Sequence, residues 1–178
     1  MKHLLWLLWA LPACLFAQNP LPEAWYGNWE GRLHIFNVQK QVAELDMQLL
    51  ISSTDSAHRA KWTILYLPDD SSGMKPNDRR EYEIIGLSDQ PGHFVIDEKN
   101  SILLDAYLLD QSLVSRFRVD NALLTVVYTL QGDSMRFEIF SGAYEALRDT
   151  GEEVKTVDAV QAFAISNYQR AQLYRQED

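Results

Sequence analysis

The chain has 178 residues, of which 47% are hydrophobic, 11% are aromatic and 23% are charged. This length suits one domain with a sizeable core, and the composition excludes wholesale disorder. The formal net charge of −9 argues against a general nucleic-acid binder, and the single Cys excludes an internal disulfide and a cysteine-rich zinc site.

Residues 1–17 have the pattern of an export signal. A basic start precedes the apolar run Leu4–Leu11, which is shorter than the roughly 20 residues of a membrane-spanning helix but fits a secretory signal. Cleavage after Ala17 would release a periplasmic or extracellular protein that has lost its only Cys. Alternatively, the sequence before Cys14 resembles a bacterial lipobox, and a lipidated Cys14 would anchor the protein. Residues 18–24 are expected to be an N-terminal linker, with no integral membrane segment after processing.

The rest of the chain, residues 25–178, predicts a single all-β domain. Apolar and polar residues alternate with period two in short runs, and turn residues such as those in 89–92 separate the runs. Only residues 167–175 approach a helical period, which predicts a short C-terminal helix. The alternating runs predict strands at 27–38, 42–52, 59–67, 80–87, 93–97, 102–109, 112–119, 122–131, 134–141 and 156–166.

Short turns join most of these strands. Asp120-Asn121 is typical of a two-residue hairpin loop, whereas 68–78 and 142–155 are longer polar loops. Consecutive antiparallel strands form a meander, and closing the meander removes its exposed edges. The leading prediction is therefore an antiparallel up-and-down β-barrel of about eight to ten strands. A two-sheet sandwich is the alternative, because alternation alone does not show closure.

The first predicted strand begins with Gly27-Asn28-Trp29, and Trp25 comes just before it. This Gly-x-Trp opening, together with the meander, resembles lipocalins and fatty-acid-binding proteins, which are calycin-type barrels. The resemblance implies that Trp29 closes the floor of a lipocalin-like barrel beneath a basic side chain from near the last strand. Arg170 is the candidate for that side chain. The chain also resembles uncharacterised secreted bacterial lipocalin-like proteins, and that likeness implies no activity.

Large apolar side chains share the predicted inner faces of the strands with Trp29. They indicate a cavity for a small hydrophobic or amphipathic ligand, in which Tyr66 and Tyr82 would supply polar contacts. A barrel filled by the same side chains explains the pattern equally well, and the protein would then be a non-enzymatic interaction or structural module. Strands 102–109 and 122–131 are apolar on both faces, which would suit a partner. The candidate ligand-binding residues are Trp29, Trp62, Tyr66, Tyr82, Phe94, Phe117 and Phe137.

The remaining polar groups fit surface and turn chemistry. Arg116 and Arg118 are expected to point outward, because Phe117 between them takes the inner face. The acidic turn 97–100, with Asp105, offers oxygen ligands for a hard cation, but turn chemistry explains it without a metal. The sequence contains no Gly-x-Ser-x-Gly elbow, Walker loop or dinucleotide fingerprint. We therefore expect no catalytic site, cofactor or metal, and the sequence leaves the oligomeric state open.

Overall fold

The computed structural model describes residues 20–68, 78–151 and 158–177. The predicted export signal, with Cys14 and Ala17, and most of the predicted loop at 68–78 lie outside these residues. A single 3-10 turn, η1 (Glu23–Trp25), precedes the strands, and no helix in the described ranges has the length and apolar character needed to cross a membrane. The strands are β1 (Gly27–Asn37), β2 (Gln41–Ser53), β3 (Arg59–Leu67), β4 (Asp78–Gly86), β5 (His93–Asp97), β6 (Leu103–Leu109), β7 (Ser112–Val119), β8 (Ala122–Gln131), β9 (Ser134–Ala143), β10 (Ala146–Thr150), β11 (Val160–Phe163) and β12 (Asn167–Arg175).

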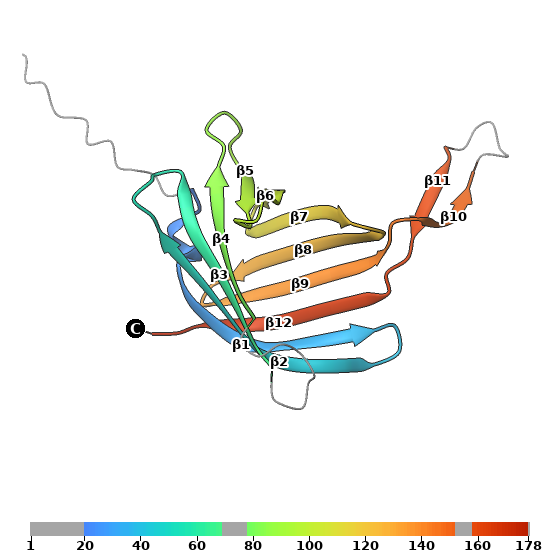
Figure 1. Ribbon diagram of the computed structural model, residues 1–178, viewed down its shortest axis with the longest axis horizontal. Coiled ribbons are helices and arrows are strands. Elements are labelled where there is room, and N and C mark those ends of the chain that lie inside the picture. The colour runs from blue at the N-terminus through green and yellow to red at the C-terminus, as the bar shows by residue number, and fades with distance from the viewer. Residues whose placement is uncertain (1–19, 69–77, 152–157, 178) are drawn as a thin grey trace, which may run out of the picture.

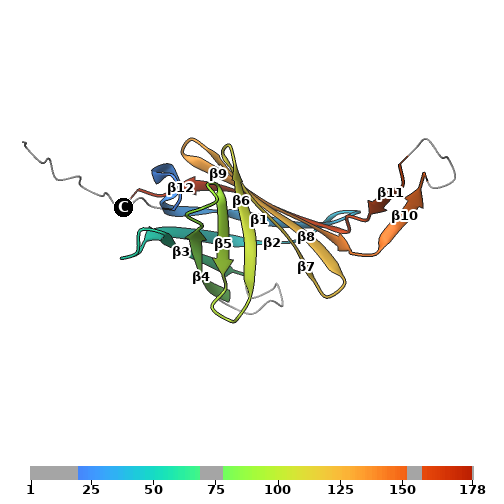
Figure 2. The ribbon, with the colours of Figure 1, turned by 90° about the horizontal axis from the view of Figure 1, so that it is seen from above.

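Ten of these strands close into one antiparallel barrel (Figures 1 and 2). From β1 to β9, each strand pairs with the next along the chain, and β12 then pairs with both β9 and β1 to complete the ring. Closure gives each of these ten strands two neighbours, so the barrel itself presents no sheet edge for aggregation within the described residues. The predicted up-and-down barrel is confirmed, and the sandwich alternative is wrong.

The alternation that predicts the strands also determines which side chains fill the barrel. Every second residue along the middle of β2 is buried, with an exposed fraction of 1% or less: Leu45, Met47, Leu49 and Ile51. On the outer face, the Arg32 guanidinium pairs with Glu44 at 3.0 Å and with Asp46 at 2.9 Å. Apolar burial is the main source of stability here, because exposed ion pairs of this kind contribute little.

Trp29 and Arg175 close one end of the barrel. Trp29 is fully buried, and its Nε1 donates a hydrogen bond to the backbone oxygen of Trp25 at 3.0 Å. The Arg175 guanidinium carbon lies 4.1 Å from the centre of the Trp29 ring, and Arg175 Nη2 donates to the backbone oxygen of Ala24 at 2.6 Å. A basic side chain from the last strand therefore covers Trp29 and ties the strand to η1.

The prediction that Arg170 covers Trp29 is wrong, for a geometric reason. Arg175 is the register partner of Trp29 across the β1–β12 pair, so the two residues lie at the same level of the barrel. Successive side chains of a strand point to opposite faces. The step from Arg170 to Arg175 is an odd number of residues, so their side chains lie on opposite faces of β12. Arg170 therefore points to the outer surface, where its guanidinium lies 5.3 Å from the centre of the Phe36 ring.

The predicted C-terminal helix is also wrong, because residues 167–175 form strand β12. Its Gln, Arg, Ala and Leu residues favour a helix in isolation. In the barrel, however, this segment completes two rows of backbone hydrogen bonds, one with β1 and one with β9. It also buries Ala171 and Leu173 at 2% and 0% exposure, a period-two pattern. Tertiary pairing and burial outweigh the local helical preference.

Strands β10 and β11 form a separate hairpin that projects away from the barrel (Figures 1 and 2). They correct the prediction of a loop over 142–155, because residues 146–150 of that segment form β10. The predicted strand at 156–166 is confirmed over 160–163, and residues 152–157 lie outside the described ranges. The hairpin keeps apolar side chains in water: Leu147 and Val160 are 71% and 54% exposed.

Candidate functional site

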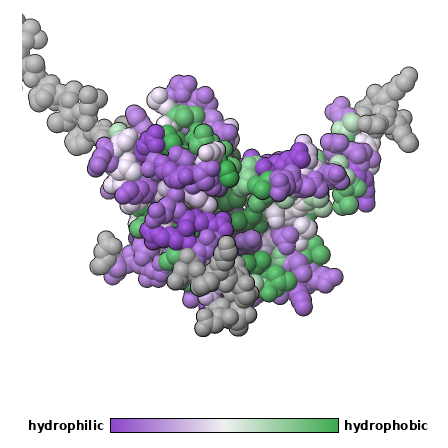
Figure 3. All heavy atoms as spheres, viewed as in Figure 1, coloured by the Kyte–Doolittle hydropathy of each residue, from purple (hydrophilic) through white to green (hydrophobic). Residues whose placement is uncertain are grey.

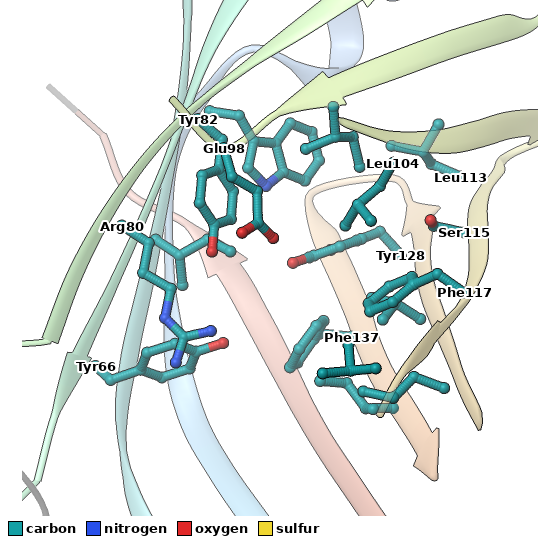
Figure 4. A pocket seen from close by; sticks show the side chains of 17 residues that line it. Tyr66, Arg80, Tyr82, Glu98, Leu104, Leu113, Ser115, Phe117, Tyr128 and Phe137 are labelled. Carbon is teal, nitrogen blue, oxygen red and sulfur yellow. The ribbon is translucent and has the colours of Figure 1, made fainter. Parts of the chain in front are cut away.

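The interior is packed around Trp25 and Trp29, and beyond that region it holds a cavity of ≈ 270 Å³. Figure 3 shows apolar residues in a hollow at the centre of the view, between more polar surfaces on either side, and Figure 4 shows the cavity from close by. Strands β3 to β9 and the turn after β5 supply the wall. The lining residues are Trp62, Ile64, Tyr66, Arg80, Tyr82, Ile96, Glu98, Leu104, Leu113, Ser115, Phe117, Val119, Leu124, Val126, Tyr128, Phe137 and Ile139.

The structure brings together most of the residues that the sequence singled out. Five of them line the cavity: Trp62, Tyr66, Tyr82, Phe117 and Phe137. The other two lie elsewhere. Trp29 is in the barrel floor beneath Arg175, and Phe94, which is 4% exposed, packs in the core as the register partner of Gly86. Neither of them lines the cavity wall.

A chain of aromatic rings connects the packed floor to the cavity. The rings of Trp25 and Trp62 have centroids 6.4 Å apart, and Trp62 meets Tyr128 edge to face at 4.9 Å. Tyr128 in turn lies 4.8 Å from Phe137. One of these contacts is edge to face and two are tilted, and at these distances the rings pack against one another along this wall of the cavity.

Three phenol groups are the neutral polar groups nearest the middle of the cavity in Figure 4: those of Tyr66, Tyr82 and Tyr128. Burial raises the pKa of Tyr66 to about 12, and it also raises the pKa of Tyr82 and of Tyr128. All three phenols are therefore uncharged at neutral pH. They can donate and accept hydrogen bonds without bringing charge into an apolar space.

Arg80 brings a cation to the cavity wall, and Asp78 balances it. Arg80 Nε and Nη2 donate to Asp78 Oδ2 at 3.1 Å and 2.8 Å, and the guanidinium carbon lies 5.1 Å from the centre of the Tyr66 ring. Burial is the largest single influence and acts to lower the pKa of Arg80, but the hydrogen bonds with Asp78 together with the charge interactions with Tyr66, Tyr82 and Asp78 outweigh it, so this pKa is raised. Arg80 is therefore charged at neutral pH.

Sequence reasoning missed Arg80, Glu98 and Tyr128 as lining residues, although the alternation contains the signal for them. Arg80 and Tyr82 are alternate residues of β4 and therefore point to the same face of the strand. Glu98, just after the end of β5, is likewise alternate with Ile96. Charged side chains mostly face solvent, so the alternation by itself does not single out Arg80, and Glu98 is predicted only as part of the acidic turn. The strand pattern places both on the inner face.

The acidic turn after β5 is held by hydrogen bonds and ion pairs within the protein. Asp97 Oδ1 accepts a hydrogen bond from the backbone nitrogen of Lys99 at 2.8 Å, and this bond lowers the pKa of Asp97. Lys99 Nζ lies 2.8 Å from Glu83, and Asp105 lies 2.7 Å from His93 Nε2. Within residues 20–68, 78–151 and 158–177, no three His, Cys, Asp or Glu side chains are grouped to hold a metal ion.

The two arginines of β7 lie on its outer face and take no part in the cavity. Arg116 and Arg118 are exposed on either side of Phe117, which lines the cavity. Arg118 Nε donates to the backbone oxygen of Asp120 at 2.6 Å, and its guanidinium lies 4.0 Å from the centre of the Tyr144 ring. The side chains of β7 that face inward and those that face outward are therefore the ones that the sequence predicted.

The raised phenol pKa values lead to an expected loss of stability in strong base. An unfolded tyrosine titrates near pH 10, whereas Tyr66 in the folded protein titrates at about 12. Below pH 10 the Tyr66 phenol is protonated in both the folded and the unfolded state, so its full contribution to the free energy of unfolding is present. Above pH 10 the unfolded state loses its proton first, so stability falls as the pH rises through about 12. Urea unfolding measured at about pH 9 and at about pH 11 gives the loss of stability between the two pH values. This loss should be smaller in Tyr66→Phe than in wild type, and equal losses would contradict the prediction.

Comparison with known proteins identifies the architecture. No protein-family model and no curated protein matches the sequence. Among solved structures, the S-type phycobiliprotein lyase CPES from Guillardia theta aligns with a TM-score of 0.58 at 8% identity, covering 86% of this chain and 89% of the lyase. Rv2717c from M. tuberculosis aligns with a TM-score of 0.55 at 11% identity, covering 87% of this chain and 94% of that protein. These identities show the fold alone, and that fold is a lipocalin-like antiparallel β-barrel.

Proposed function

We propose that this protein is an exported, lipocalin-like binding protein that holds a small hydrophobic or amphipathic ligand inside its barrel. The observation that carries the proposal is the cavity of ≈ 270 Å³, whose wall is mainly apolar and aromatic with a few polar groups. Small-molecule sites combine apolar walls with a small number of placed polar groups in this way. The likeness to other lipocalin-like barrels supports binding inside the barrel and does not identify the ligand.

In this proposal, the ligand contacts the aromatic residues that both the sequence and the cavity wall single out. Phe117 and Phe137 face the apolar part of the ligand, and Tyr66 and Tyr82 offer hydrogen bonds to a polar group. Burying the apolar part of a ligand against such a wall removes its surface from water, which is the main driving force for binding.

Export is the second part of the proposal, and it depends on residues 1–17. A basic start, a short apolar run and cleavage after Ala17 would deliver the barrel to the periplasm or the extracellular space. Lipidation of Cys14 is the alternative route, and it would hold the same barrel at a membrane. The two routes differ in the first residue of the mature protein and in its mass.

Mass spectrometry of the protein purified from its natural host tests both parts. We expect organic extraction to release one class of small molecule, and we expect the intact mass to correspond to a chain that starts at Gln18. Binding of an uncharged apolar fluorescent probe to the extracted protein gives a second readout. A protein that carries no extractable molecule and binds no apolar probe would overturn the binding function. A mass that includes a lipid on Cys14 would replace the soluble route by the anchored one.

The outer face of β6 favours a second candidate function, an interaction module that acts through its surface. Leu103, Tyr107 and Leu109 point outward from β6 with exposed fractions of 64%, 46% and 61%. Apolar side chains gathered on one face often mark a protein contact. Light scattering over a broad concentration range tests self-association. A strictly monomeric protein would exclude a second copy of this chain as the partner.

A further inference from the structure

Glu98 places a carboxylate in the wall of a mainly apolar cavity. It is half-buried, and Figure 4 shows its carboxylate directed into the cavity between Tyr82 and Tyr128. The Asn100 side-chain nitrogen donates to Glu98 Oε2 at 3.3 Å, a long hydrogen bond. Across the three described ranges, no basic side chain lies within ion-pair distance of Glu98. A carboxylate drawn partly out of water in this way gains from a cationic partner.

The other charged group of the wall does not supply that partner. The Arg80 guanidinium is already hydrogen-bonded twice to Asp78 and stacked on the Tyr66 ring. Its side chain is also 47% exposed, so water screens its charge. Because Asp78, which is not part of the cavity wall, already pairs with Arg80, Glu98 is the charged group of the wall that has no ion-pair partner within the described residues.

The groups beside Glu98 also suit a cation. Tyr82 and Tyr128 lie on either side of the Glu98 carboxylate in Figure 4, and the ring of Trp62, another lining residue, lies 4.9 Å from that of Tyr128. The faces of these aromatic rings carry negative potential. Their polar groups are neutral phenols and an indole, which add no competing charge. A protonated amine placed here would meet a carboxylate and aromatic faces together, whereas a ligand carboxylate would be repelled by Glu98.

We propose that the ligand is an organic cation: an apolar or aromatic molecule whose protonated amine pairs with Glu98 while its apolar part lies against Phe117 and Phe137. The inference rests on the proposed binding function and names the chemical class of its ligand. A charge-assisted hydrogen bond to a partly buried carboxylate is among the stronger polar contacts that a protein makes. Losing this contact should weaken binding by about tenfold or more.

A matched series of ligands separates charge preference from simple apolar binding. Octylamine, octanol and octanoate share one alkyl chain and differ in the charge of the end group. Each would displace an uncharged fluorescent probe from wild type, from Glu98→Gln and from Glu81→Gln. Glu81 is a matched control, because its carboxylate is 68% exposed, pairs with Arg79 and lies outside the cavity wall.

We expect wild type and Glu81→Gln to bind octylamine at least about tenfold more tightly than octanoate. In Glu98→Gln, octylamine should lose about tenfold in affinity while octanol binds as before, and circular dichroism should show a folded barrel. Equal binding of the three ligands, or tighter binding of octanoate, would overturn the cation proposal and leave the binding function intact. Failure of every ligand and of the probe would instead overturn the binding function itself.

Discussion

Leu124→Trp is expected to weaken binding of an apolar probe strongly while leaving the barrel folded. Leu124 lies in β8 and lines the cavity, so an indole at this position would occupy the space that the ligand needs. With a cavity of only ≈ 270 Å³, we expect affinity to fall at least tenfold, which corresponds to about 1.4 kcal/mol. Titration with an uncharged apolar fluorescent probe measures the change.

Leu123→Trp is the matched control for this variant. Leu123 is the preceding residue of the same strand and is also partly buried, but it points away from the cavity. Overpacking the interior at Leu124 could cost about 1–3 kcal/mol of stability, so thermal unfolding of both variants must accompany the titration. The proposed site would be wrong if Leu124→Trp bound the probe as wild type does, or if both variants lost binding equally.

Trp29→Ala is expected to destabilise the barrel by about 3–5 kcal/mol, the range for truncating a fully buried Trp. Trp29 is 0% exposed, supports the Arg175 guanidinium at 4.1 Å and donates a hydrogen bond to Trp25. Removing the indole leaves a cavity in the floor and deprives the Arg175 cation of its aromatic face. Urea unfolding followed by circular dichroism gives the change in the free energy of unfolding.

Two further variants show whether the loss comes from the floor itself. Trp29→Phe keeps an aromatic ring but loses the hydrogen bond to Trp25, so it should cost less than Trp29→Ala. Tyr174, which precedes Arg175, is 58% exposed. Removing its ring in Tyr174→Ala should change stability by no more than about 0.5 kcal/mol. A loss below 1 kcal/mol in Trp29→Ala would show that the floor does not hold the barrel together.

The strand pattern could be predicted from the sequence because each strand has one face in the core and one in water. In β2, apolar residues alternate with polar ones, and the structure buries Leu45, Met47 and Leu49 as the alternation requires. The same logic placed Phe117 inside and its two arginine neighbours outside. Most of the aromatic wall of the cavity was therefore predictable without coordinates.

Predictions failed where contacts between distant segments outweigh local preference. Residues 167–175 have a composition that favours a helix, yet pairing with β1 and β9 makes them the strand that closes the ring. The cover for Trp29 depends on the register between β1 and β12, which sets Arg175 rather than Arg170 opposite the indole. Neither the pairing partners nor their register is encoded in a short stretch of chain.

By itself, the sequence determined the all-β class, the meander and the inward-facing aromatic residues, because a period of two needs only local alternation of apolar and polar side chains. Only the tertiary structure decided that the interior is partly open. The volume left inside a closed barrel depends on how closely the side chains of strands β3 to β9 approach one another across the interior. Amino-acid composition does not determine how close these side chains come. The same closure turned Glu98, which looks like one more acid of an acidic chain, into a charge that faces an apolar cavity.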